Sequence, residues 1–298
     1  MSRVELAVEK VKRLDESQAE ALLEWLDLRD NQEALRQRLD AAEPPVHEEP
    51  IPPIVPAIDD LLILRTLDMS KKIKKEDYED ELEKYQGKLN LLTRHDDFKK
   101  LSIVVVFEGN DAAGKGGSIR RITQGLDARQ YRIFPVAAPS EEEQAQPYMW
   151  RFWRNIPRKG RFAIFDRSWY GRVLVERVEG ICQRADWMRA YGEINDFEEQ
   201  LVRNRTVVVK FWLSISQAEQ LRRFKEREKI GFKRFKITDD DWRNRDRWNE
   251  YELAACDMID RTGSEIAPWT LVEANDKYYA RIKVLKTLCE KIEKALVK

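Results

Sequence analysis

The chain has 298 residues, enough for one sizeable domain with an appendage. Charged residues make up 36% of it, yet 54 basic side chains balance 54 acidic ones. Residues 1–60 carry 7 basic and 15 acidic side chains, so residues 61–298 have a net charge of +8. A basic domain favours a polyanionic substrate, although an ordinary solvated surface is the plainer alternative.

The spacing of the cysteines, the number of histidines and the hydropathy of the chain argue against several classes of protein. Cys182, Cys256 and Cys289 are scattered without metal-ligand spacing, as expected in a reducing cytoplasm. His47 and His95 have no evident partners, which argues against a zinc site or a phosphohistidine intermediate. No apolar run approaches the length of a membrane span, and the N-terminus is too acidic and polar for a signal peptide. We therefore expect a cytoplasmic protein that does not contact a membrane.

The N-terminal residues are predicted to form an appendage to the main domain. Apolar residues at helical spacing predict an acidic helical hairpin over 1–40. Residues 41–57 hold six of the eleven prolines and predict an extended linker. The main domain is expected at 58–298.

A phosphate-binding loop is predicted near residue 109. Ile103 to Phe107 is a run typical of a strand buried on both faces, and the spacing of Gly109, Gly114 and Lys115 fits the P-loop pattern. A glycine-rich turn without a ligand is the alternative. In the P-loop reading, backbone N–H groups and a helix N-terminus bind phosphate, and Lys115 adds a full charge. The candidates for binding phosphate or nucleotide are Gly109, Asn110, Ala112, Ala113, Gly114, Gly116, Gly117, Ser118, in the following helix Arg120 and Arg121, and further along the chain Arg172.

The loop departs from the usual pattern at one position. The Ser or Thr that normally follows the lysine is Gly116, and Asp111 lies inside the loop instead. A carboxylate among phosphate-binding N–H groups is unfavourable unless a cation lies between them. We therefore predict that Asp111 is a ligand of Mg²⁺ (or Mn²⁺) in place of the missing hydroxyl.

Strands and helices alternate along the rest of the domain, which predicts a three-layer α/β fold of the P-loop kinase type with a parallel central sheet. After the strand at 103–107, further strands are expected at 131–136, 161–166, 206–213 and 269–272, and helices at 78–92, 118–126, from 139 through 154, at 186–203, from 217, from 239 and at 278–296.

The strand that ends at Asp166 resembles a Walker B element. Four apolar residues precede the acid, and Arg167 and Arg172 follow it. An acid at this end of a central strand lies beside the phosphate loop, where a second metal ligand is needed. The alternative is that Asp166 caps the next helix.

A basic lid is predicted over about 217–250. Between Arg222 and Lys236 there are eight basic and two acidic residues. In this place a helical lid can close over phosphates, and its arginines can offset charge on the transferred group. A charged, solvated helix pair is the alternative. The lid candidates are Arg222, Arg223, Arg227, Lys233 and Arg234.

Two motifs resemble the second polyphosphate kinase family, the P-loop polyphosphate:nucleotide phosphotransferases. They are Glu-Gly-Asn-Asp-Ala-Ala-Gly-Lys-Gly-Gly at 108–117 and Phe-Asp-Arg-Ser-Trp-Tyr at 165–170, and residues 232–238 and 265–269 are similar to the family's lid and closing strand. The resemblance spans about residues 58–298. The hairpin lies outside it, and this chain has one phosphate loop where some relatives have two fused domains.

The resemblance implies Mg²⁺-dependent phosphate transfer between inorganic polyphosphate and a nucleotide. Lys115 would contact the exchanged phosphates, Asp111 and Asp166 would hold the metal, and Arg167 would contact the acceptor's phosphate. Residues 169–177 are similar to members that phosphorylate AMP to ADP, whereas other members prefer diphosphates. A homo-oligomer, dimer or tetramer, is expected.

Three other functions stay open on the sequence. They are an ATP-dependent kinase of a small molecule, a non-catalytic nucleotide sensor, and nucleic-acid binding through residues 222–236. The last is disfavoured because no nucleic-acid motif is present.

Overall fold

The structure is a computed structural model that describes residues 62–231 and 239–297. The predicted hairpin, the predicted linker, and Lys233 and Arg234 of the predicted lid lie outside the described residues. The domain boundary near residue 58 therefore stays a prediction.

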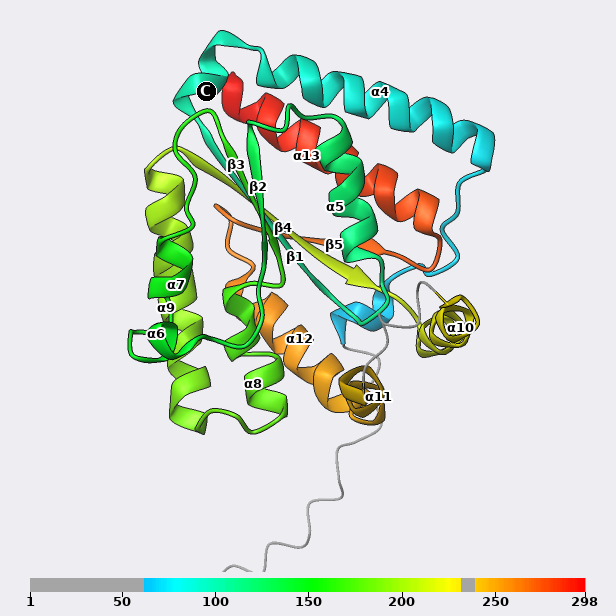
Figure 1. Cartoon of the computed structure of the whole chain (residues 1–298), viewed down its shortest axis with the longest axis vertical. Coiled ribbons are helices and arrows are strands. Elements are labelled where there is room, and N and C mark those ends of the chain that lie inside the picture. Colours follow the sequence, from blue (N-terminus) through cyan, green and yellow to red (C-terminus); the bar gives the residue numbers. More distant parts are fainter. Residues whose placement is uncertain (1–61, 232–238, 298) are drawn as a thin grey trace, which may run out of the picture. The chain divides into compact units, whose positions relative to one another are not determined.

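A five-stranded parallel sheet forms the centre of the domain, with the strand order β2-β3-β1-β4-β5 (Figure 1). All five predicted strands are confirmed close to their expected bounds, as is the parallel direction of each pair. The strands are β1 (Ser102–Gly109), β2 (Tyr131–Pro135), β3 (Phe162–Asp166), β4 (Thr206–Ser214) and β5 (Trp269–Glu273).

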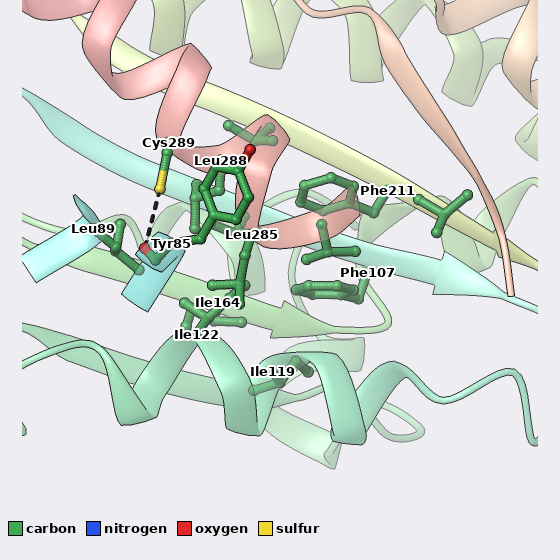
Figure 2. Close-up of a cluster of buried hydrophobic side chains, with 14 of the residues drawn as sticks. Tyr85, Leu89, Phe107, Ile119, Ile122, Ile164, Phe211, Leu285, Leu288 and Cys289 are labelled. Atoms are coloured by element: carbon green, nitrogen blue, oxygen red, sulfur yellow. Dashed lines mark hydrogen bonds between the residues drawn. The ribbon is translucent and has the colours of Figure 1, made fainter. Parts of the chain in front are cut away.

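Helices cover both faces of the sheet, which confirms the three-layer architecture. Side chains of β1 alternate between the faces, so Ile103 and Val105 enter one core and Val104 and Val106 the other. On the first face, α4 (Lys75–Thr93), α5 (Lys115–Gln124) and α13 (Lys277–Leu296) pack over the sheet (Figure 2). On the second face lie α7 (Trp150–Trp153), α8 (Val175–Val178), α9 (Arg184–Arg203) and α12 (Trp248–Thr262).

One predicted helix is wrong in its extent. The segment from 139 to 154 forms two short helices, α6 (Glu141–Gln144) and α7, rather than one. Ser140 and Glu143 close a capping box at the start of α6, as the acid-rich first turn indicates. Pro147 ends the first helix because it has no N–H to donate and disfavours the helical conformation of the residue before it.

The remaining elements connect this framework. They are η2 (Ile63–Thr66), η3 (Asp96–Lys100), η4 (Trp169–Arg172), α10 (Gln217–Glu228) and α11 (Asp239–Asp246). Helices α10 and α11 fall within the predicted lid. Ser216 caps α10 by accepting a hydrogen bond from the Glu219 amide. In the described part of the chain, no helix is both long and apolar enough to cross a membrane.

Candidate functional site

The loop between β1 and α5 has the backbone conformation that its glycines predict. Gly109 has φ +138°, and a Cβ there would lie 2.2 Å from the carbonyl oxygen of Leu213 on β4. Gly114 has φ +109° and precedes α5. Lys115 begins α5, and its Nζ donates to the carbonyls of Gly109 at 2.7 Å and Asn110 at 3.2 Å. The amine thus lies back across the loop, beside a helix N-terminus whose first amides have no partner within the helix.

Asp111 joins three parts of the site. Its Oδ1 lies 3.3 Å from a guanidinium nitrogen of Arg167, and its Oδ2 accepts a 2.9 Å hydrogen bond from Asn244 of α11. The side chain is only 14% exposed. The phosphate loop, the segment after β3 and the predicted lid therefore meet at one carboxylate.

Asp166 lies beside the loop, as the Walker B interpretation requires. It pairs in register with Phe107 on β1 and ends β3. The side chain that caps the following helix, η4, is Ser168, which accepts a hydrogen bond from the Tyr170 amide. The capping alternative for Asp166 is therefore wrong. Arg167 follows in a left-handed conformation, with φ +64°.

Glu108 is a buried carboxyl at the same end of the sheet that lies outside the predicted site residues. It is 5% exposed and accepts a 2.8 Å hydrogen bond from the Ser168 hydroxyl. Burial raises the pKa of Glu108 from 4.5 to about 7, against the lowering effect of Ser168 and Lys115. Protonation of Glu108, which the raised pKa favours, reduces its repulsion with Asp166. An acid in the last positions of a buried strand is the signal that identifies it.

A basic cavity of about 210 Å³ adjoins the second half of the loop. Arg223 and Arg227 of α10 line it, together with Lys277 and Arg281 of α13. Burial, and then the charge of Arg223, lower the pKa of Lys277, as expected where cations crowd. Lys277 and Arg281 lie outside every predicted motif. Lys277 nevertheless closely follows the fifth strand, and the carboxyl ends of parallel strands converge on one site. One acid, Glu226, lies among these cations in the lining. The rest of the lining comes from the loop, the start of α5 and α13: Ala112, Ala113, Gly114, Gly117, Ser118 and Ala280.

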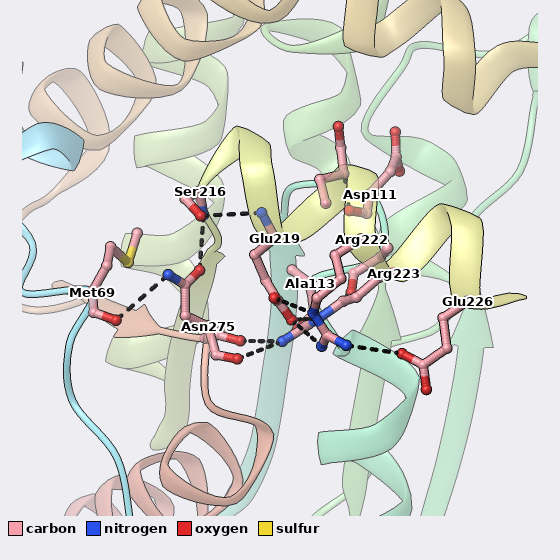
Figure 3. Close-up of polar contacts among 12 residues, drawn as sticks. Met69, Asp111, Ala113, Ser216, Glu219, Arg222, Arg223, Glu226 and Asn275 are labelled. Atoms are coloured by element: carbon pink, nitrogen blue, oxygen red, sulfur yellow. Dashed lines mark hydrogen bonds and ion pairs between the residues drawn. The ribbon is translucent and has the colours of Figure 1, made fainter.

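Arg223 supports the loop from within the domain (Figure 3). One nitrogen donates to the carbonyls of Ala112 and Ala113, and another to those of Ala274 and Asn275, at 2.7–3.0 Å. Its Nε donates to Glu219 at 2.6 Å, and only 3% of the side chain is exposed. The predicted lid arginine is thus engaged by the protein, and α10 is fastened to the loop at this position.

The other predicted arginines differ in their placement. Arg222 is 58% exposed and pairs with Glu219 and Glu226. Arg172 pairs with Glu176 at 2.8 Å and lies over the ring of Tyr148. Neither Arg120 nor Arg121 lines a cavity beside the loop among the described residues. The structure therefore brings Arg223 and Arg227 to the loop and leaves these four arginines away from it.

A second cavity, of about 100 Å³, adjoins the first half of the loop. Its floor carries Glu108, Asp111 and Arg167, while Gln220 and Asn244 place amide groups on its wall. Its lining shares no residue with that of the basic cavity. Aromatic and aliphatic side chains supply the remaining walls: Leu174, Val175, Trp212, Trp248 and Tyr251.

A buried ion pair fixes the segment that carries Arg167. Lys210 of β4 is fully buried and donates to Glu198 of α9 at 2.7 Å. Glu198 also accepts hydrogen bonds from the Trp169 indole and the Tyr170 hydroxyl. Lys210 donates in addition to Tyr170 and to the carbonyl of Thr262. The Walker B-like segment is therefore held by α9, β4 and α12 together.

Comparisons with known proteins identify the family of the chain. The family model for polyphosphate kinase 2 matches residues 72–298. A polyphosphate:AMP phosphotransferase of Pseudomonas aeruginosa is 60% identical over 246 residues, which is 83% of this chain and 50% of that protein. A polyphosphate:AMP phosphotransferase of Pseudomonas syringae pv. tomato is 57% identical over 266 residues, which is 89% of this chain and 53% of that protein. The chain thus spans about half the length of the curated relatives it matches.

Solved structures give the same result. A polyphosphate kinase 2 from Pseudomonas aeruginosa superposes with a TM-score of 0.78 at 61% identity, covering 79% of this chain and 50% of that chain. A polyphosphate kinase 2 from Arthrobacter aurescens gives a TM-score of 0.74 at 30% identity and covers 78% of this chain and 85% of that chain. The phosphate loop, the acid at the end of β3 and these matches lead to one conclusion: the chain belongs to the polyphosphate kinase 2 family.

Proposed function

We propose that this domain transfers the terminal phosphate of inorganic polyphosphate to AMP. The observation that carries the proposal is the pair of cavities with different linings on the two halves of the phosphate loop. The basic cavity suits the phosphates of a polyanionic donor, and the aromatic walls of the second cavity suit contact with a nucleotide base. The most similar relatives described above are named for AMP. A more distant relative is named an ADP-polyphosphate phosphotransferase, so a diphosphate acceptor is the second candidate.

The donor set near the loop fits magnesium. Within residues 62–231 and 239–297 no three His, Cys, Asp or Glu side chains are grouped as a metal site. Magnesium commonly binds through one or two carboxylates together with water and substrate phosphates. Asp111 and Asp166 would supply those carboxylates, and the ion would offset negative charge on the phosphates. Manganese satisfies the same donor chemistry.

The side chains of this domain would act by positioning and charge neutralisation. Lys115 would leave the carbonyls of Gly109 and Asn110 to contact the phosphates being exchanged. Arg167 would hold the acceptor's phosphate. Of the cations that line the basic cavity, Arg227, Lys277 and Arg281 would hold the donor chain, since Arg223 is engaged by the protein. Transfer would proceed in line between the two cavities without a covalent enzyme intermediate. The three cysteines are free thiols, in keeping with a reducing cytoplasm as the proposed compartment.

One assay tests the proposal. Purified protein, magnesium and polyphosphate are mixed with AMP, GMP, ADP or GDP, and the next higher nucleotide is measured. We expect ADP from AMP as the main product, and a loss of about 100-fold or more in Lys115→Ala. Turnover of a non-nucleotide acceptor with ATP alone would instead establish a small-molecule kinase. Tight nucleotide binding without any turnover would establish a sensor. Whether the domain forms a dimer or tetramer is decided by light scattering on the same sample.

A further inference from the structure

A third cavity lies at the opposite end of the sheet from the phosphate loop. It measures about 560 Å³ and is lined by the amino ends of β2 and β3 and by the segment after α7. We call it the arginine cavity, because five of its lining residues are Arg129, Arg132, Arg154, Arg158 and Arg161.

The charge of the arginine cavity is only partly offset within the described structure, where Asp127 lies close enough to Arg161 for that arginine to help lower the pKa of the carboxyl. No Asp or Glu is among the described residues that line it. Arg129 pairs with Asp127 at 2.9 Å, and Arg154 pairs with Glu142 at 3.3 Å. Over residues 62–231 and 239–297, Arg132, Arg158 and Arg161 form no ion pair. Arg129, Arg132, Arg154 and Arg158 are exposed, so water and salt screen part of their mutual repulsion. A multivalent anion that contacts several of them would remove the rest, which makes the cluster a candidate anion site.

The chemistry of the lining favours a phosphate chain. Arginine presents a planar set of donors that matches phosphate oxygens in pairs, and Gln130, Tyr131 and Asn155 add polar groups to the same wall. The volume falls in the range of ligand pockets. A concave pocket of this kind admits a thin single chain, whereas duplex nucleic acid needs a broader face.

We propose that the arginine cavity is a second docking site for long inorganic polyphosphate, which rests on the proposed function. The cavity and the phosphate loop are separated along the five residues of β3, about 16 Å at the usual rise per residue. One long chain can therefore occupy both sites, and a chain held at the arginine cavity has a raised effective concentration at the loop. A short polyphosphate chain occupies one site at a time, so binding at the arginine cavity does not raise its effective concentration at the loop.

A pair of matched triple variants tests this site. Arg132→Gln/Arg158→Gln/Arg161→Gln removes the unpaired charges, and Arg94→Gln/Arg189→Gln/Arg203→Gln removes three exposed arginines elsewhere. KM is measured for long polyphosphate and for the shortest chain that the wild type uses, at equal phosphate content. We expect KM for the long chain to rise about tenfold in the cavity variant only, with the short chain unchanged.

Three results would overturn the proposal. The first is an equal change in KM for both chain lengths, and the second is no change in KM for either. The third is loss of retention on duplex DNA with unchanged polyphosphate kinetics, which would assign the cavity to nucleic acid. Binding of long polyphosphate is measured in parallel on Lys115→Ala protein with and without the cavity substitutions. If the wild type shows no turnover, the proposed function fails, and this binding measurement alone decides the cavity: an unchanged affinity rejects it.

Discussion

Arg223 donates a 3.0 Å hydrogen bond to the carbonyl of Ala113, which places an arginine of α10 directly against the backbone of the phosphate loop. The same guanidinium reaches Ala274 and Asn275 after β5. Because these donors are used by the loop backbone, the carbonyls of Ala112 and Ala113 are fixed against α10. These contacts fasten α10 to the loop at residue 223, so we expect a lid movement to involve the residues that follow it.

Arg223→Lys keeps the charge, but a lysine amine cannot replace all the hydrogen bonds that the guanidinium donates to the loop and to the segment after β5. We expect a loss of about 2–3 kcal/mol in the free energy of unfolding, because buried carbonyls lose charged partners, together with a drop in kcat. Arg222→Lys is the matched control, since Arg222 is 58% exposed and should change stability by less than about 1 kcal/mol. Urea denaturation and the phosphotransfer assay measure both. Equal effects of the two substitutions would contradict the role given to Arg223.

Glu108 should make stability depend on pH in the absence of magnesium and substrates. Its pKa is raised to about 7 in the folded state from an ordinary 4.5, so between these values the folded state binds more protons than the unfolded state. Stability is therefore lost as pH rises from about 4.5 through 7, and levels off above.

Glu108→Gln removes this titration and can still accept the hydrogen bond of Ser168. Relative to wild type, the variant should gain up to about 3 kcal/mol between pH 5 and pH 8. Denaturation at several pH values in chelator measures the difference. Parallel stability curves for the two proteins would show that Glu108 ionises normally.

The buried pair of Lys210 and Glu198 should couple strongly. Lys210→Met leaves a carboxylate buried without its cation, at a cost of about 3–5 kcal/mol in unfolding free energy. Adding Glu198→Gln removes the stranded charge and should recover part of the loss. A double-mutant cycle by urea denaturation gives the coupling energy. Losses that simply add would mean that the pair does not act as a unit.

Gly116 offers a test of the metal assignment. A Cβ at Gly116 meets no atom within 4 Å, so a serine fits at the position where most P-loops carry their metal-binding hydroxyl. Asp111→Asn should abolish turnover. Adding Gly116→Ser should raise it at least about tenfold if Asp111 replaces that hydroxyl as a metal ligand. Activity retained in Asp111→Asn alone would remove Asp111 from the metal site.

Local patterns in the sequence were sufficient for much of this molecule. The runs around Ile103 and Phe162 predict buried strands because period and composition report burial directly. The spacing of Gly109, Gly114 and Lys115 predicts the loop, since the left-handed conformations that glycine permits are a property of single residues. The predicted single helix from 139 through 154 is wrong because it overlooked Pro147, which is also a local signal, since proline lacks an N–H to donate.

Only the tertiary structure decided which distant side chains serve the loop. A run of basic residues in α10 does not reveal that Arg223 faces inward onto Ala113 while Arg222 faces solvent. Lys277 and Arg281 approach the loop from α13, more than 150 residues along the chain. Their placement depends on the order of β1, β4 and β5 in the sheet. Contacts of this kind arise from the packing of whole elements, which no local pattern of residues records.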